Sequence, residues 1–395
     1  MTKGRPPFIW DSSIGREEER AVARVMKSKV LSDFYGSPGP RFLGGVEVQA
    51  LDSEWARFFK VPHAVSMNSA TSGLFAAIQS LQLKPGDEVL VPTFTMSATA
   101  AAVAAVGAVP VFTDVEPDTF CLCPRAAARA ITQKTRAIFA VNLFGQPADL
   151  TALGKLARAH KLWLIEDNAQ APGALHKGVY AGTVGDIGVF SLNCHKAIQC
   201  GEGGVAVTRD EKLATRLQLI RNHGENVLGS RVPRNLRGFL GQNYRLTELQ
   251  AAVAREQLKK LPAITRRRQE RAARLRHTLA RFGFLRAPKV RADCTHVYYL
   301  FPLLYRPDEL GVSRDQFISA LNTFGYSASR YVAPLYTLGA FKGRSKGSAT
   351  SCPVSEELWR KTLFYPNLIR YRIGLLEIDT FADVVRKIVK KHGGA

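Results

Sequence analysis

Two residues, Lys196 and Asp167, have side chains suited to binding an aromatic ring that accepts electrons. Lys196 ends the segment Ser191–Lys196, just before the run Gly201–Gly204, and Asp167 follows the apolar segment Leu162–Ile165. A lysine amine forms a Schiff base with an aldehyde, and a carboxylate holds a pyridine nitrogen protonated so that the ring accepts electrons. Lys196 and Asp167 therefore predict a pyridoxal-phosphate (PLP) site, in which the released lysine amine is also the natural base for moving a proton.

Asp167 is expected to be partly buried, because an apolar strand precedes it. An unpaired carboxylate is costly in such a place, so a charged partner is expected. The pyridine nitrogen of PLP is one candidate partner, and a helix cap or an internal salt bridge is the alternative. Glu166 is expected to point to the opposite face of the strand, since side chains alternate along a strand.

The segment Asn68–Gly73 is small and polar, and it opens a predicted helix. Phosphates bind where a helix N-terminus supplies unpaired N–H groups and nearby hydroxyls. The same pattern is equally typical of an ordinary helix cap. The sequence therefore predicts a helix start here and leaves its role as a phosphate site open.

Strand and helix patterns alternate from about residue 60 to residue 208. Such alternation predicts an α/β fold, a mostly parallel sheet flanked by helices, and ligands then bind beyond the carboxyl ends of the strands. Asp167 and the residues after Phe190 lie at such ends. The predicted strands are 88–91, 109–114, 137–142, 162–167, 187–191 and 205–208, and the predicted helices are 71–83, 148–160 and 210–222.

The second half of the chain predicts a smaller α+β domain. Residues 246–261 have helical spacing, and Pro262 is expected to break or bend this helix before a basic helix that reaches about Phe282. A strand is expected over 297–304 and a helix over 313–324. The predicted organisation is an N-terminal arm (1–14), a large cofactor-binding domain (15–262) and a small C-terminal domain (263–395).

Composition indicates a globular protein with an unusual charge. The chain has 395 residues, of which 46% are hydrophobic and 22% are charged, and its net charge is +22. The basic stretch 266–276 lacks the interleaved aromatic residues of a nucleic-acid site, so we interpret it as a solvated helix face and expect no nucleic-acid partner. A positive field that attracts anionic substrates is the other interpretation.

The cysteines and the apolar runs add expectations about location. The six cysteines show no paired metal-ligand spacing, so no metal site is predicted. No secretory signal is recognised at the start of the chain, which favours reduced thiols in a cytoplasmic enzyme. The uncharged run 89–113 contains Pro92, Gly107 and Pro110, which is typical of strands and turns, so no membrane span is expected.

Six segments in this order make the chain resemble the DegT/StrS-type sugar aminotransferases, a branch of the fold-type-I PLP enzymes. The resemblance covers roughly residues 8–390. Each segment alone is a weak signal, whereas six in register are a strong one. The segments are Asn68–Leu74, Pro92–Met96, Phe144–Pro147, Ile165–Asp167, Ser191–Gly204 and Gly241–Leu246.

The resemblance implies a set of cofactor contacts. Gln170 matches the family residue near the ring oxygen of the cofactor. Asn243 matches an asparagine that reaches the cofactor phosphate of the neighbouring subunit, which implies a homodimer with shared active sites. Met96 stands where many relatives place an aromatic ring, so it either contacts the cofactor or belongs to the core. The further contacts implied by the resemblance are Thr71, Ser72, Ser191 and Asn193.

The resemblance also implies an activity and a substrate class. The implied reaction moves an amino group from glutamate or glutamine to a keto-sugar, by family analogy a nucleotide-linked one. Arg245 is expected to hold a substrate carboxylate or to brace the interface, and His223 lies near the substrate opening or has a structural role. Arg330 and Tyr331 are expected to shape the acceptor pocket.

Other functions of the same fold remain as alternatives. The acceptor is alternatively a cyclitol or another keto compound. A related branch carries histidine in place of the lysine and performs dehydration, and the presence of Lys196 argues against that reaction. A PLP-binding sensor protein is the alternative outside enzymes, and Lys196 together with Asp167 argues against it.

Overall fold

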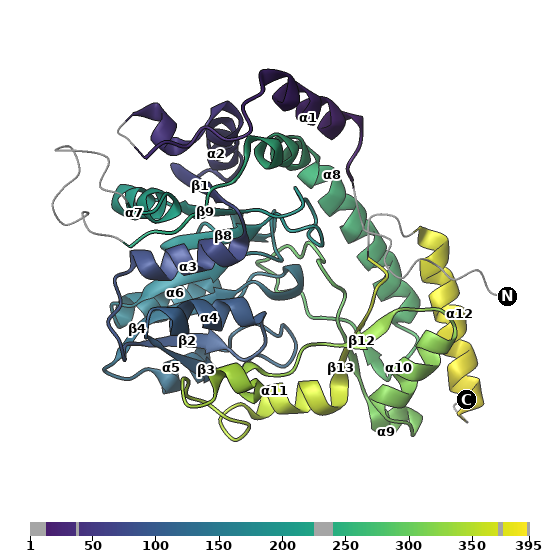
Figure 1. Ribbon diagram of the computed structural model, residues 1–395. Coiled ribbons are helices and arrows are strands. Elements are labelled where there is room, and N and C mark those ends of the chain that lie inside the picture. Colours follow the sequence, from purple (N-terminus) through teal and green to yellow (C-terminus); the bar gives the residue numbers. More distant parts are fainter. Residues whose placement is uncertain (1–12, 37–38, 225–239, 370–373, 393–395) are drawn as a thin grey trace.

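The computed structural model describes residues 13–36, 39–224, 240–369 and 374–392 (Figure 1). Most of the predicted arm, 1–14, lies outside these residues. The large sheet has seven strands in the order β1-β9-β8-β5-β4-β2-β3. Their bounds are β1 (His63–Met67), β2 (Glu88–Pro92), β3 (Val109–Thr113), β4 (Thr135–Val141), β5 (Trp163–Asp167), β8 (Ile187–Ser191) and β9 (Gly204–Thr208).

This sheet confirms the prediction of a mostly parallel α/β fold. All adjacent pairs from β8 to β3 are parallel, and β9 is antiparallel to both of its neighbours, β1 and β8. The predicted strands agree with the observed ones to within two residues at each end. β1 was not predicted, although its sequence, His-Ala-Val-Ser-Met, is short and mostly apolar.

Helices cover both faces of the sheet, as Figure 1 shows. One cluster of buried side chains joins the sheet to α3 (Ala70–Ser80), α4 (Ser97–Ala105) and α7 (Glu211–Arg221). A second cluster on the other face joins it to α5 (Pro124–Ala130) and α6 (Leu150–Ala159). Because both faces are covered, strands such as β2 are buried at every position and are apolar almost throughout.

The long helix α8 (Glu248–Leu279) links the two halves of the molecule (Figure 1). It begins at a capping box formed by Thr247 and Gln250, and it continues through Pro262 without ending. Its first half packs with α2 (Val46–Phe59) on β8 and β9, and its second half packs on the smaller sheet. The expected break at Pro262 is therefore absent, and a domain boundary at residue 262 stays a proposal.

The C-terminal half is built on a four-stranded antiparallel sheet in the order β10-β11-β13-β12. Its strands are β10 (Leu285–Arg286), β11 (Leu303–Tyr305), β12 (Ala328–Arg330) and β13 (Leu363–Pro366). The helices of this half are α9 (Pro307–Leu310), α10 (Arg314–Thr323), α11 (Pro353–Glu357) and α12 (Leu375–Lys391), and α1 (Arg16–Ser28) packs on α8.

The predicted strand over 297–304 is wrong for most of its length, because only its last residues lie in β11. The amide of Val297 donates a 2.8 Å hydrogen bond to the carbonyl of Gly145, and that of Leu300 donates a 3.3 Å bond to the carbonyl of Phe144. The segment therefore pairs with the loop after β4 instead of with a sheet. This pairing attaches the start of the small half to the predicted site.

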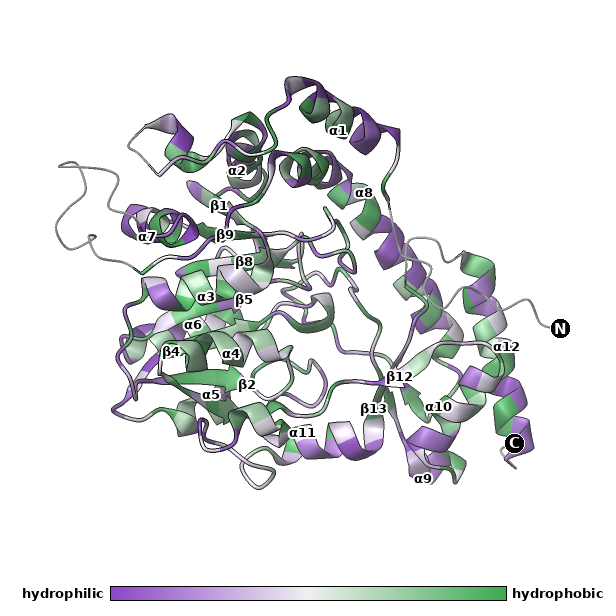
Figure 2. Ribbon diagram, in the orientation of Figure 1, coloured by the Kyte–Doolittle hydropathy of each residue, from purple (hydrophilic) through white to green (hydrophobic). Residues whose placement is uncertain are grey.

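Hydropathy follows these layers. Figure 2 shows hydrophobic residues on β2 and hydrophilic stretches along α1 and α8. Among the described segments, no helix combines the length and the apolar character that a membrane crossing would need.

Candidate active site

The carboxyl ends of the parallel strands meet at one edge of the large sheet, and the predicted site residues follow them. Met67 at the end of β1 lies beside Gly204 of β9, which lies beside Ser191 at the end of β8. Asp167 ends β5 beside Val189. The sheet thus gathers the predicted phosphate segment, the acidic residue and the lysine block at the edge where open α/β sheets bind ligands.

Asp167 is buried at this edge, with 5% of its surface exposed. Thr99 of α4 donates a 2.8 Å hydrogen bond to Oδ2, and the amide of Ala169 donates a 3.1 Å bond to Oδ1. Burial raises the pKa of Asp167, while these hydrogen bonds and the charge of Lys196 lower it. Within the described residues Asp167 has no salt bridge, so its charge is available to a cationic ligand.

Lys196 lies in the loop after β8, and its Nζ is 4.7 Å from the ring centroid of Tyr299. The carbonyls of Tyr298 and Tyr299 accept hydrogen bonds of 3.1 and 3.3 Å from buried Arg268 of α8. Arg268 therefore fixes the segment whose ring attracts the Lys196 ammonium. We interpreted the basic stretch of α8 as a solvated face, and for Arg268 that interpretation is wrong, because its guanidinium satisfies buried carbonyls.

Gln170 and Tyr331 meet beside Asp167, although they are far apart in sequence. Gln170 Oε1 accepts a 2.8 Å hydrogen bond from the amide of Phe144, and its side chain also bonds to Tyr331. The ring of Tyr331 lies edge-on to Phe144, with 4.6 Å between centroids. Burial raises the pKa of Tyr331, and the charge of Asp167 adds to this effect. Tyr331 is therefore a neutral hydroxyl at the site.

The start of α3 presents hydroxyl side chains to the same edge. Ser69 caps the helix by accepting a 3.0 Å hydrogen bond from the amide of Ser72, and the two hydroxyls are 2.9 Å apart. The Ser72 hydroxyl also bonds to the side chain of Asn68, and Thr71 is exposed. Ser69 is therefore the cap of α3. Thr71 and Ser72 lie on the first turn of the helix, where a phosphate would bind.

Two glycines let α3 begin close to the sheet. A Cβ built on Gly204 would lie 2.4 Å from the amide nitrogen of Ala70, and one built on Gly73 would lie 2.8 Å from Cγ1 of Val189. Contacts this short require the neighbouring group to move. Gly204, which ends the glycine run after Lys196, therefore has a steric role, because it admits the helix N-terminus against β9.

We expect Gly204→Ala to weaken PLP binding by more than tenfold and to lower the free energy of unfolding by about 1–3 kcal/mol, the usual cost of overpacking. The added methyl would displace the backbone of Ala70 and thus the first turn of α3. Fluorescence titration with PLP and urea unfolding measure the two effects. Gly339→Ala is the control, because its Cβ would have no neighbour within 4 Å. Unchanged PLP affinity in Gly204→Ala would refute this account of α3.

These groups fit PLP. The amine of Lys196 matches its aldehyde, the buried carboxylate of Asp167 matches its ring nitrogen, and the first turn of α3 matches its phosphate. Gln170 and Tyr331 add neutral polar groups beside Asp167. The predicted cofactor is thus compatible with burial, charge and hydrogen bonding at this edge.

Asn243, Arg245 and His223 form one cluster next to the start of α3. Nε of Arg245 donates a 3.0 Å hydrogen bond to Oδ1 of Asn243, and its Nη2 lies 3.3 Å from Nε2 of His223. The carbonyl of Asn243 accepts a 3.2 Å bond from the side chain of Asn68. Arg245 therefore orients the amide of Asn243, which is exposed.

The lysine loop is held by hydrogen bonds of its own side chains. The amide of Asn193 donates a 3.3 Å bond to the hydroxyl of Ser191, and Nδ2 of Asn193 donates a 2.8 Å bond to Glu202. The carbonyl of Asn193 accepts a 2.9 Å bond from the amide of Lys196. Ser191 and Asn193 thus shape this loop, and their predicted contacts with the cofactor stay predictions.

Met96 and Arg330 are exposed, unlike the buried Asp167 at the centre of the site. Met96 precedes α4, and 65% of its surface is exposed, so the alternative that it belongs to the core is wrong. Its position three residues before Thr99 leaves a cofactor contact open. Arg330 is exposed, and its Nε lies 3.7 Å from Asp315 of α10. Tyr331 packs on Phe144 at the site, whereas Arg330 contacts Asp315 within the small half.

Glu166 supports the site from the opposite face of β5, as alternation along the strand predicts. Its buried carboxylate accepts bonds of 2.6 to 2.8 Å from the amides of Gly182, Val184 and Gly185, and a 3.0 Å bond from Asn142. No local pattern in the sequence indicates this role of Glu166. Thr99, Tyr299 and Arg268 were also missed, since only tertiary contacts bring them to the site.

Comparisons with known proteins agree with this geometry. The family model of the DegT/DnrJ/EryC1/StrS aminotransferase family matches residues 14–374. The chain is 35% identical to the dTDP-3-amino-3,4,6-trideoxy-alpha-D-glucose transaminase of Streptomyces venezuelae, covering 92% of this chain and 91% of the relative. It is 36% identical to the UDP-N-acetyl-3-dehydro-alpha-D-glucosamine 3-aminotransferase of Acidithiobacillus ferrooxidans, covering 89% and 90%.

Solved structures show the same fold. S. venezuelae DesV, determined with a ketimine intermediate, superposes with a TM-score of 0.82 at 33% identity, covering 95% of this chain and 94% of that one. A GDP-4-keto-6-deoxymannose-3-dehydratase with a trapped PLP-glutamate geminal diamine superposes with a TM-score of 0.84 at 26% identity, covering 94% and 98%. The chain therefore belongs to the DegT/DnrJ/EryC1/StrS family and is a PLP-dependent aminotransferase with a type I fold.

Proposed function

We propose that the protein transfers an amino group from glutamate or glutamine to the keto group of a nucleotide-linked sugar. The observation that carries the proposal is the convergence of Lys196, Asp167 and the first turn of α3 at one sheet edge. The two relatives described above are named for aminated sugars linked to dTDP and UDP. A cytoplasmic location stays a prediction.

Each residue has a defined task in this reaction. When bound, PLP supplies the electron sink that stabilises negative charge at the substrate carbon. Asp167 holds its buried negative charge against the ring nitrogen, and Thr99 and the Ala169 amide keep that carboxylate in place. Lys196 accepts and returns the substrate proton through Nζ, and the ring of Tyr299 lies beside this amine.

The charge of the chain supports an anionic acceptor. A nucleotide-linked sugar carries a diphosphate, and a net charge of +22 attracts it over a long range. Arg245 and His223 belong to the cluster next to the start of α3. Because Arg245 orients Asn243, we assign it first to bracing the shared site and second to contact with an acidic substrate group.

The first test is the absorption spectrum of the purified protein with PLP, before and after addition of glutamate or glutamine. We expect the absorption of the lysine-bound cofactor to disappear and 2-oxo acid to form in equal amount. Adding UDP- and dTDP-linked keto-sugars should then restore the absorption and yield an amino sugar. A spectrum indifferent to both donors would exclude them as donors, and release of water from the sugar without amination would favour the dehydratase.

We also propose a homodimer in which Asn243 of one subunit completes the other subunit's site. Co-expressed Lys196→Ala and Asn243→Ala chains are then expected to recover about a quarter of the wild-type activity. Random pairing makes half of the dimers mixed, and in each mixed dimer one of the two symmetric sites is intact. Each variant alone is the control. The assay uses a PLP concentration that is too low to load the Asn243→Ala protein with cofactor. No recovery in a confirmed mixed dimer would place Asn243 in the site of its own subunit.

A further inference from the structure

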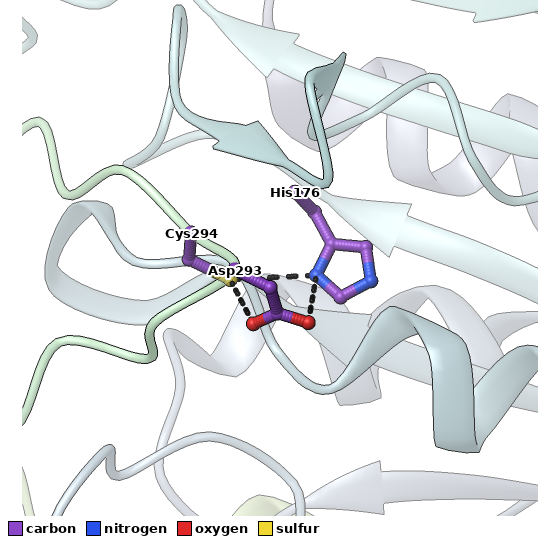
Figure 3. Close-up of side chains that lie close together, drawn as sticks. All are labelled: His176, Asp293 and Cys294. Atoms are coloured by element: carbon purple, nitrogen blue, oxygen red, sulfur yellow. Dashed lines mark hydrogen bonds and ion pairs between the residues drawn. The ribbon is translucent and has the colours of Figure 1, made fainter.

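A second cluster of reactive side chains lies away from Lys196, where the two halves of the chain meet. His176 of β6 (Leu175–His176) faces Asp293 and Cys294, which belong to the segment leading toward Tyr299 (Figure 3). Their nearest ligand atoms all lie within 4.8 Å of one another. No sequence motif indicates this group, because His176 and Cys294 are 118 residues apart.

The ligand atoms of the three side chains lie close to the separations found around a zinc ion. Nδ1 of His176 is 3.3 Å from Sγ of Cys294 and 4.0 Å from Oδ2 of Asp293, and Sγ is 3.4 Å from Oδ1 of Asp293. Zinc binds sulfur at about 2.3 Å and nitrogen or oxygen at about 2.0–2.2 Å, which at tetrahedral angles separates the ligand atoms by roughly 3.4–3.6 Å. The carboxylate of Asp293 faces His176 with Oδ2 and Cys294 with Oδ1, so it would have to rotate to bring one oxygen toward both.

The backbone holds the cluster in register. His176 and Cys294 form an isolated antiparallel bridge. The amide of Lys177 donates a 2.7 Å hydrogen bond to the carbonyl of Asp293, and the amide of Thr295 donates a 2.9 Å bond to the carbonyl of Leu175. Ligands that are fixed before a metal arrives lose little conformational freedom on binding.

The second ring nitrogen of His176 has a hydrogen-bond partner of the kind that a metal-bound histidine has. Nε2 of His176 is 2.8 Å from the hydroxyl of Thr151 on α6, which leaves Nδ1 for the cluster. A second hydrogen bond of this kind orients a histidine ligand and fixes its tautomer. Nε of Arg291 lies 3.8 Å from Oδ1 of Asp293, so Oδ2 is the carboxylate oxygen that faces His176.

Zinc binding also changes the protonation of the cluster. The thiol of Cys294 donates a hydrogen bond to Oδ1 of Asp293 and therefore carries a proton. Zinc has to displace that proton, which passes to solvent, and a coordinating thiol is deprotonated by the metal itself.

We propose that His176, Asp293 and Cys294 bind one zinc ion through Nδ1, a carboxylate oxygen and Sγ, with water as the fourth ligand. Neutral imidazole, carboxylate and thiolate balance the charge of the divalent ion. The ion would fasten the hairpin of β6 and β7 (Val179–Tyr180) to the segment that carries Tyr298 and Tyr299. The cluster lies outside the group of residues around Lys196, so we assign the ion no step in amino transfer.

Cobalt titration of the PLP-loaded protein, stripped of metal with a chelator, tests this proposal. Tetrahedral cobalt absorbs in the visible range, outside the absorption of PLP. We expect one cobalt ion per chain, displacement of that ion by zinc, and a melting temperature that rises with zinc concentration, because ligands of the folded state stabilise it. Thr151→Val should weaken zinc binding about 10- to 100-fold.

Cys294→Ser should abolish the cobalt band, and Cys123→Ser is the matched control that should keep it. Cys123 is a free thiol of similar partial exposure. PLP absorption reports that each variant is folded. A wild-type protein without the band at saturating cobalt would overturn the proposal, and so would a band that survives in folded Cys294→Ser.

Discussion

Lys196→Ala is expected to lose amino transfer by about 10⁴-fold or more, because proton transfer by a positioned base contributes about 10²–10⁴-fold by itself and the covalent attachment is lost as well. The variant should bind PLP only reversibly, through the start of α3 and Asp167. Its absorption with PLP should lack the band of the lysine-bound cofactor. Stopped-flow absorbance after mixing with glutamate measures the loss directly.

The control for this experiment is Lys155→Ala, since Lys155 is exposed on α6. It should retain both the absorption and the rate of the wild type. Added methylamine or ethylamine is expected to restore part of the Lys196→Ala rate, because a free amine can occupy the space of the missing side chain. Full activity in a Lys196→Ala protein free of wild-type chains would exclude Lys196 as the base.

Asp167→Asn is expected to lower kcat by about 100- to 1,000-fold, the range seen when one preorganised charge-stabilising group is removed. The amide has the shape of the carboxyl group but carries no charge to hold a ring nitrogen protonated. Steady-state kinetics with the donor alone, read as formation of the 2-oxo acid, gives this number. Asp383→Asn is the control, because it makes the same change on the exposed surface of α12. A rate within threefold of the wild type would contradict the assigned role of Asp167.

The same substitution should stabilise the cofactor-free protein near pH 7. Burial raises the pKa of Asp167 in the folded state above its unfolded value of about 3.9. The folded protein then binds its proton more tightly, so stability falls as pH rises from about 3.9 through the folded pKa. Urea unfolding of the two cofactor-free proteins should show a gain in Asp167→Asn at pH 7 that shrinks toward pH 4. With PLP bound, the wild-type protein should be more stable than Asp167→Asn.

Local sequence determined the main elements of the large sheet correctly, because each element depends on its own periodicity and caps. The strand at 187–191 is apolar up to its last residue, Ser191, and Asp210 caps α7 as its side-chain type predicts. The ends of α8 also follow local signals, but Pro262 did not end it. A helix interior tolerates a proline when packing on both sides outweighs one lost hydrogen bond.

The residues of the candidate site also fall into those with a local sequence signal and those that only tertiary contacts bring in. Lys196 and Asp167 are recognisable from the sequence because their chemistry and their motifs are local. Thr99, Tyr299, Tyr331 and Arg268 have no such local pattern, and they contact the site only because helices and loops pack across the sheet edge. Local sequence can indicate which groups carry charge and where strands end.

The sequence by itself thus determined the type of fold and the cofactor chemistry, and it predicts which residues carry that chemistry. Tertiary structure alone decided which partners hold those residues. Arg268, in a stretch that the sequence marks as solvated, is buried against the carbonyls of Tyr298 and Tyr299. His176 meets Cys294 across 118 positions because a strand of the large half pairs with the segment entering the small one. Such contacts follow from packing between distant segments, and no short pattern in a sequence encodes them.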